Sequence, residues 1–107
     1  MTLAELYTKL NSGTLTGKVA YNAFPVGEAP SLPYICIVCT STDNFGADNK
    51  VYFKRQNVNI ELYTELKDPT TESAIESVLD SNEVFYEATD TYLDDERCFE
   101  RIYEIEV

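Results

Sequence analysis

The feature that most constrains the fold is a regular alternation of apolar and polar residues in the middle of the chain. Val58, Ile60 and Leu62 are separated by the single polar residues Asn59 and Glu61. Successive side chains of a strand point to opposite faces, so this segment predicts a strand with one buried and one polar face. The segment 34–40 is apolar and β-branched nearly throughout, which predicts a strand covered on both faces. The simplest arrangement is two long antiparallel strands joined by a polar loop at 41–50.

Two helices are expected on either side of these strands. Thr2 and Glu5 form a capping box at the start of the first helix. Asp68 followed by Pro69 is typical of a helix N-cap with proline in the first helical position. The second helix should run to about residue 80.

The remaining segments complete a single domain over residues 1–107. The segment 24–33 holds three prolines and one glycine, so it predicts an ordered crossing loop rather than a helix or a central strand. The expected fold is α+β, in the order α-β-β-β-α-β-β, with a mostly antiparallel sheet of four to five strands and two helices packed on one face. The further strands are predicted at 19–24, 84–88 and 99–107, and the segments 51–55 and 57–64 together are the third strand.

The charge is strongly negative and unevenly placed. The net charge is −11, of which the first sixty residues carry +1 and the rest −12. Such a surface repels nucleic acid. The simpler interpretation is a device for solubility. The functional interpretation is a face that must not adhere to DNA, or that meets a basic partner.

Candidate chemistry is sparse, and we predict neither an enzyme nor a metal or cofactor site. The chain has no histidine and three cysteines. Cys36 and Cys39 form a Cys-x-x-Cys pattern, but on a strand they point to opposite faces about 10 Å apart, too far for a disulfide. Core cysteines are expected instead. The run Asp94-Asp95-Glu96 reads as a charged turn, because no positioned partner for a carboxylate dyad is apparent.

Three segments resemble the tail-completion proteins of long-tailed bacteriophages and prophages, also called tail terminator or neck proteins. Together the segments cover most of the chain in the expected order. They are Ala20-Tyr21, Phe24-Pro25, Gly27, Ala29-Pro30 and Leu32-Pro33-Tyr34-Ile35; then Asn44-Phe45-Gly46-Ala47-Asp48-Asn49-Lys50-Val51-Tyr52; then Ile60-Glu61-Leu62-Tyr63-Thr64 and Lys67-Asp68-Pro69 with the closing Tyr103-Glu104-Ile105-Glu106.

The resemblance implies a structural subunit that caps the tail tube and makes the joint to the head. Members of the family commonly act as rings, often hexamers, through which DNA passes without specific binding. The implied partners are further copies of the chain, the tail-tube protein and a head-side connector protein. Assembly would take place in the cytoplasm of the bacterial host, an expectation that agrees with the lack of a signal peptide or a long apolar run at the N-terminus.

Two sets of residues are candidates for this role. The loop 41–50 and the basic residues after it are expected to contact another subunit or the tail tube, although Phe45 could instead pack on its own sheet. A stripe of carboxylates at i, i+4 spacing is expected on one outer face of the second helix, where a solvated face is the simpler interpretation and the lining of a DNA passage the functional one. The contact residues are Asn44, Phe45, Asp48, Lys50, Lys54 and Arg55, and the stripe is Glu72, Glu76 and Asp80.

Two other classes of function compete with this interpretation. An acidic mimic of DNA, which inhibits a host DNA-binding protein, would suit the negative second half. Such a mimic should display regularly spaced carboxylates on a broad face, whereas here the acids are spread over helix, strands and turns. A small enzyme is the other alternative, which the missing histidine and the unpaired carboxylates disfavour.

Overall fold

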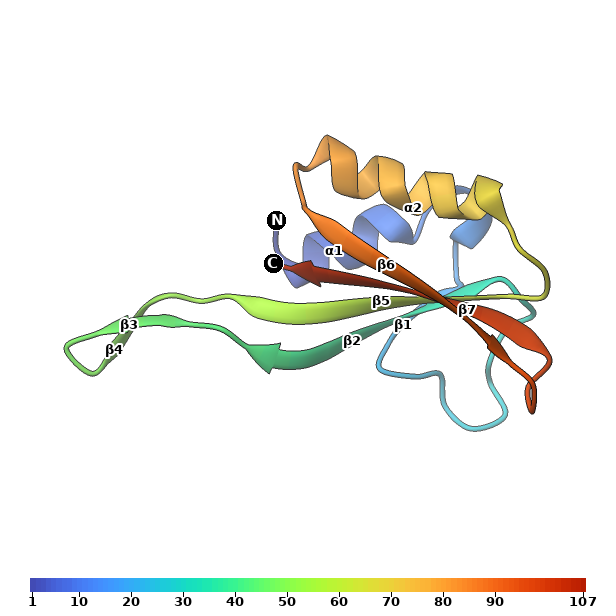
Figure 1. Cartoon of the computed structure of the whole chain (residues 1–107), viewed down its shortest axis with the longest axis horizontal. Coiled ribbons are helices and arrows are strands. Elements are labelled where there is room, and N and C mark those ends of the chain that lie inside the picture. Colours follow the sequence, from blue (N-terminus) through green and yellow to red (C-terminus); the bar gives the residue numbers. More distant parts are fainter.

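The structure, a computed structural model, describes the backbone of residues 1–107 and all side chains except those of Ala47, Tyr52 and Phe53. A five-stranded sheet in the order β1-β2-β5-β7-β6 carries two helices on one face (Figure 1). The elements of this layered part are α1 (Leu3–Leu10), the short 3₁₀ helix η1 (Gly13–Leu15), β1 (Val19–Tyr21), β2 (Tyr34–Thr42), β5 (Gln56–Thr64), α2 (Pro69–Ser81), β6 (Tyr86–Leu93) and β7 (Cys98–Glu106).

The predicted α+β fold and element order are confirmed, with one refinement to the sheet. The strand β1 runs parallel to β2, with Val19 opposite Ile35, while every other pair in this sheet is antiparallel. The sheet is therefore mixed. The predicted strand 19–24 is shorter than expected because Asn22 adopts a positive φ of 62° and Pro25 follows soon after.

Both helix starts lie where the capping signals predicted them. The Thr2 hydroxyl accepts a hydrogen bond from the Glu5 N–H at 3.1 Å. The Asp68 carboxylate accepts from both the N–H and the hydroxyl of Thr71, at 3.1 and 2.6 Å. Each cap satisfies backbone donors that have no partner within the helix.

The core lies between the helices and the sheet. Its centre is formed by the alternating residues of β2, β5 and β7 on the helix side, together with the inward stripes of the two helices. Its most buried members are Leu6, Ile35, Ile37, Val58, Ile60, Leu62, Ile75, Leu79 and Tyr103. The alternation in β5 thus identified the buried face correctly.

The strand β2 is covered on both faces only in its first half. There the loop 22–33 lies across the sheet face opposite the helices, and Phe24 packs edge-to-face on Tyr34 at 5.4 Å between ring centroids (Figure 1). Cys36 is buried, as expected, but Cys39 is exposed. The prediction that both are core residues was wrong for Cys39, which lies on the helix side of β2 with Ile35 and Ile37 but close to the point where the strand leaves the body for the ribbon.

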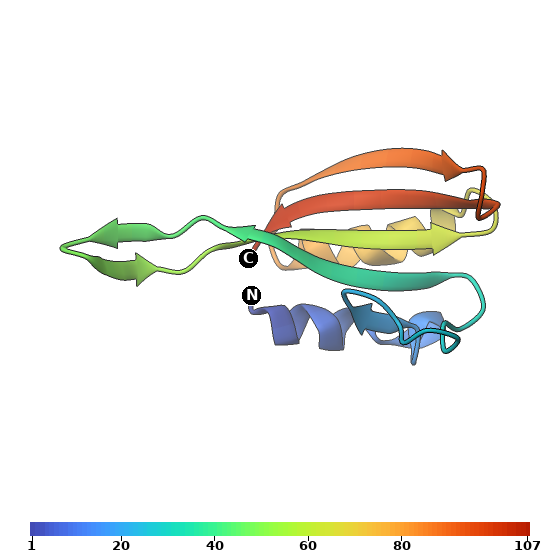
Figure 2. The same cartoon turned by 90° about the horizontal axis from the view of Figure 1, so that it is seen from below.

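Beyond residue 42 the two central strands continue into a projecting β-ribbon rather than the predicted polar loop. The ribbon consists of β3 (Phe45–Ala47) and β4 (Lys50–Phe53), and it gives the molecule extents of 49 × 29 × 23 Å (Figures 1 and 2). Asp48 and Asn49 form its turn with positive φ of 53° and 62°, a conformation that Asp and Asn tolerate. The strand expected at 51–55 corresponds to β4, whereas β3 lies in the segment that was expected to be a loop.

The C-terminal hairpin is longer than predicted. The strand β6 begins at Tyr86 and ends at Leu93, whereas the sequence indicated 84–88. Its outer part is polar and exposed because β6 is an edge strand beyond the cover of α2. The charged run 94–96 forms the turn to β7, as predicted.

The Asp68 cap generates a test of stability against pH. Replacing Asp68 by Ala should lower the free energy of unfolding by about 1 kcal/mol at neutral pH, because two donors of Thr71 lose their acceptor. The hydrogen bonds from the Thr71 hydroxyl and N–H hold the pKa of Asp68 below its usual value. The contribution is therefore complete above the unfolded pKa of about 4 and is lost as the pH falls through the lower folded pKa.

The difference in unfolding free energy between the wild type and Asp68→Ala, measured by urea titration, should accordingly shrink from about pH 5 to about pH 2. Glu65→Ala, an exposed carboxylate near the same helix end, is the control and should change stability little at any pH. A difference for Asp68→Ala that stays constant over this range would contradict the assignment.

Candidate assembly surface

The described residues contain no cluster of three or more His, Cys, Asp or Glu side chains that would hold a metal ion. Burial raises the pKa of the Cys36 and Cys98 thiols, so both stay protonated and unreactive at neutral pH. The surface features that remain are the ribbon, a groove at its base and a network of charges under α2.

The ribbon separates the predicted contact residues into two groups. Phe45, Asp48 and Lys50 lie on its outer part, where Phe45 is 63% exposed. Asn44 lies at its base, where its side-chain oxygen accepts a hydrogen bond from the Arg55 N–H at 3.2 Å and ties the two strands together. Lys54 is exposed at the base as well.

Arg55 is directed towards its own sheet rather than towards the ribbon tip. Its guanidinium lies 3.5 Å from the Glu106 carboxylate, with both side chains about half exposed. An ion pair of this exposure contributes little to stability. Arg55 therefore forms one wall of the groove at the ribbon base.

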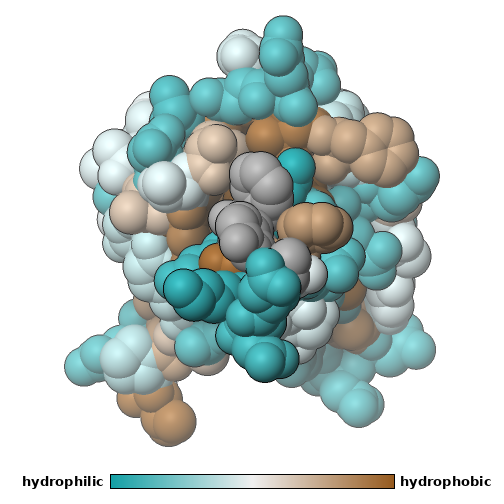
Figure 3. All heavy atoms as spheres, turned by 90° about the vertical axis from the view of Figure 1, so that its left-hand side faces the viewer, coloured by the Kyte–Doolittle hydropathy of each residue, from teal (hydrophilic) through white to brown (hydrophobic). Residues whose placement is uncertain are grey.

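This groove, which we call the basal groove, has a volume of about 580 Å³ and lies where β6 begins and β7 ends. Asn57 and Arg55 line the side next to the ribbon, and Phe85 lies on the opposite side with 78% of its surface exposed. Figure 3 looks along the ribbon at this end of the molecule, where brown hydrophobic surface appears behind and beside the ribbon among hydrophilic residues. The acidic side chains of the groove are Glu83, Glu87, Glu104 and Glu106.

Sequence reasoning missed Phe85 and the groove. The apolar run from Val84 to Tyr86 was assigned as a whole to a strand, and strand residues alternate in burial. Val84 and Tyr86 are half-buried against the core, so the residue between them faces outward. That alternation was the available signal.

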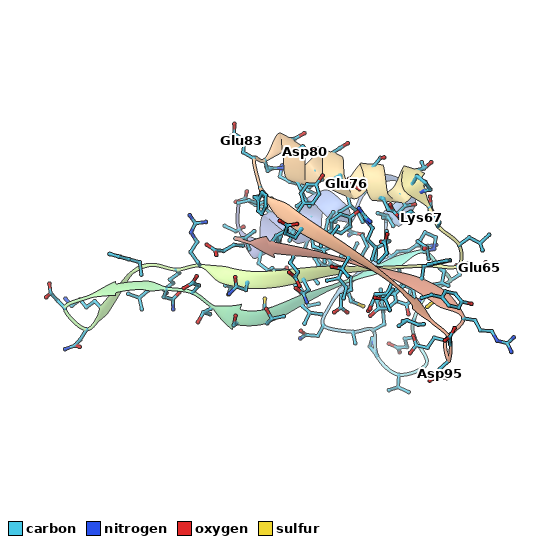
Figure 4. All side chains as sticks on the ribbon, in the orientation of Figure 1. Glu65, Lys67, Glu76, Asp80, Glu83 and Asp95 are labelled. Atoms are coloured by element: carbon cyan, nitrogen blue, oxygen red, sulfur yellow. The ribbon has the colours of Figure 1, made fainter. Side chains whose placement is uncertain are left out.

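The carboxylate stripe does not form the outer, solvated face that was expected. Glu72 is only 8% exposed, and its carboxylate lies 3.0 Å from the Lys67 ammonium and 3.6 Å from the Arg101 guanidinium. Glu76 accepts a hydrogen bond from the Tyr103 hydroxyl at 2.9 Å. The prediction was wrong for these two residues because that face of α2 is turned towards β7 and β6. Asp80, at the far end of α2, is exposed (Figure 4).

Arg101 is the centre of this network. It projects from the helix-facing side of β7 and forms an ion pair with Asp90 at 2.8 Å, while its Nε donates to the Tyr103 hydroxyl at 2.9 Å. The bond from Arg101 holds the pKa of Asp90 below its usual range. Burial raises the pKa of Tyr103, so its hydroxyl remains a neutral donor to Glu76. The sequence signal for Arg101 was a single charge on the apolar face of the last strand.

The opposite face of the sheet carries glutamates of the last two strands. Glu87 on β6 and Glu104 on β7 are directly opposite each other in the antiparallel register, and both are exposed. Like charges in directly opposed positions destabilise a sheet by a few tenths of a kcal/mol or more. This pair lies in the basal groove.

Comparison with known proteins gives one likeness in fold. No protein-family model matches the chain, and no curated protein matches its sequence. Its structure is similar to a chain of a solved structure described as the virion of a native gene transfer agent particle, with a TM-score of 0.52 and 13% sequence identity. The match covers 95% of this chain and 90% of that one. The two chains therefore share a fold over almost their whole length. Within the described chain no helix is both long and apolar enough to cross a membrane.

The network around Arg101 predicts a large loss of stability when it is broken. Replacing Arg101 by Met should lower the free energy of unfolding by roughly 2–4 kcal/mol, because Glu72 stays buried with only Lys67 to balance it. Arg55→Met, which breaks the exposed pair with Glu106, is the matched control and should cost less than about 1 kcal/mol. Denaturant titration of both variants measures the two losses. Equal losses would show that burial of the Arg101 network has no energetic consequence.

Proposed function

We propose that the chain is a structural, non-enzymatic subunit of a phage or prophage virion, a tail-completion protein that caps the tail tube and joins it to the head. The observation that carries the proposal is the likeness in fold, over nearly the full length of both chains, to a chain of a virion particle. The resemblance of the proline-rich, ribbon and β5 segments to tail-completion proteins supports a position in the neck.

The shape of the molecule supports a role in assembly. A ring of identical subunits related by rotation needs two different complementary patches on each subunit. We assign these roles to the projecting ribbon, which extends from one end of the layered body (Figure 2), and to the groove that lies at its base. In the proposed ring each subunit contacts two neighbours, the tail tube and the head-side connector protein.

The first test is the mass of the purified protein by light scattering, alone and after mixing with its tail-tube protein. The proposal expects a ring of about six subunits, or a ring that forms only in the presence of tubes. A protein that remains a monomer, ignores tubes and binds a basic DNA-binding protein instead would overturn it in favour of the DNA mimic. The mimic is disfavoured because Glu72, Glu76 and Asp90 are occupied by Arg101, Lys67 and Tyr103 of the same chain.

The path of DNA through the ring generates a second test. Glu72 and Glu76 hold the fold together, so of the predicted stripe we keep the exposed Asp80 as the residue that faces passing DNA. Asp80→Lys would place one cation per subunit around the passage and create a grip on phosphates. We expect the variant to assemble normally and to slow DNA delivery in an infectivity assay.

The matched control for the DNA path is Asp95→Lys, which makes the same charge change in the turn at the other end of the molecule (Figure 4). It should leave delivery unchanged. Normal delivery by Asp80→Lys particles would show that this end of α2 does not face the DNA.

A further inference from the structure

We propose that the outer part of the ribbon of one copy docks in the basal groove of the next copy, so that one repeated contact builds the ring. The inference rests on the proposed function for its assembly, and it adds which two surfaces meet. The occupant of the groove is a second copy of this chain.

The position and the surface of the ribbon favour contact with another molecule. β3 and β4 pair with each other beyond the end of the main sheet (Figures 1 and 2). The ribbon carries exposed apolar side chains, with Phe45 at 63% and Val51 at 49% exposure. Their exposure is explained if the ribbon is packed against another surface in the assembled state.

The groove offers complementary chemistry. Its exposed Phe85 supplies apolar surface beside a volume of about 580 Å³. The opposed Glu87 and Glu104 repel each other, and a cation placed between them would remove that repulsion. Lys50, exposed beside the turn of the ribbon, is such a cation. The contact therefore joins apolar to apolar surface and one ammonium to a pair of carboxylates.

The geometry excludes docking of the ribbon in the groove of its own subunit. Arg55 and Asn57, where the ribbon joins β5, line the groove themselves. The ribbon leaves from this point and extends away from the body (Figure 2). Its tip can therefore reach only the groove of another molecule. Because the tip and the groove are different surfaces, the contact repeats head to tail and closes when the rotation allows.

Cross-linking between two single-cysteine variants tests the contact directly. In a Cys39→Ser background, which removes the exposed thiol and leaves Cys36 and Cys98 buried, one protein carries Asp48→Cys at the ribbon turn and a tagged protein carries Glu83→Cys in the groove, so that both Glu87 and Glu104 are kept. A short bismaleimide reacts with one thiol at each of its two ends. It therefore links two proteins only where their introduced cysteines lie close together. We expect roughly tenfold more mixed dimer than for Asp48→Cys with Glu28→Cys, an exposed position in the loop 22–33.

A charge exchange tests the chemistry of the same contact. Lys50→Glu on the ribbon partner should reduce the mixed dimer roughly tenfold, and Glu104→Lys on the groove partner should restore it. Equal yields for the groove and loop positions, or no restoration by the paired reversal, would overturn the inference. Light scattering could instead show that the final assembly is a dimer, in which each ribbon docks in the groove of the other subunit. This result would overturn the proposed ring.

These outcomes are separate from those of the proposed function. Capping of tail tubes with no ribbon-to-groove cross-link would leave the tail-completion role intact and reject this contact. A strong cross-link without any binding to tubes would establish the contact and reject the position in the tail.

Discussion

The antiparallel pairing of β2 with β5 is the constraint on which the rest of the structure depends. On the helix side these strands supply five of the most buried side chains, namely Ile35, Ile37, Val58, Ile60 and Leu62. Both helices pack on that face, β1 adds to one side of the pair and β7 to the other. The same two strands then leave the core and carry the ribbon. The register of this one strand pair thus determines both the packing of the body and the position of the ribbon.

Arg101 links two acidic elements of the second half of the chain, α2 and β6. Arg101 lies opposite Leu62 in the register of β5 with β7, beneath α2 and beside β6. From there it reaches carboxylates on both of these elements. The carboxylates of α2 and of the edge strand β6 would repel each other. Arg101 and Lys67 lie between them and replace this repulsion by attraction. The remaining carboxylates are left on the surface, where they face water or a neighbour.

Much of the fold was predictable because its signals are local. The alternation in β5, the two capping patterns and the prolines of 24–33 each act over a few residues, and each was confirmed in position. The ribbon was predicted only in part: its second strand was expected at 51–55, but β3 is three residues long and shows no alternation that distinguishes it from a loop. The position of Glu72 and Glu76 was also beyond the sequence. Their spacing fixed a common face of the helix, but which face turned inward depended on Arg101, located 25 or more residues away along the chain.

For the candidate surfaces, too, the features encoded within one segment were predictable and those formed by distant segments were not. Phe45 and Lys50 were identified from a loop-like segment and lie on the projecting ribbon, so their exposure was foreseeable. The basal groove combines residues from the N-terminus, the ribbon base, the start of β6 and the end of β7. No pattern within one segment indicates that such distant parts form one hollow. These parts come together only when the strands have paired into one sheet.

Phe45 and Val51 of the ribbon are exposed in the single subunit, and this has a consequence for how the sequence can change. Residues of a core are constrained by every neighbour they touch, so substitutions there are tolerated only within narrow limits of volume. The exposed residues of the ribbon are not subject to this limit on volume. They are constrained chiefly by the geometry of the turn and by the surface that they contact. Related chains can therefore diverge at the tip of the ribbon, and adapt to different neighbours, without having to remake the body that carries it.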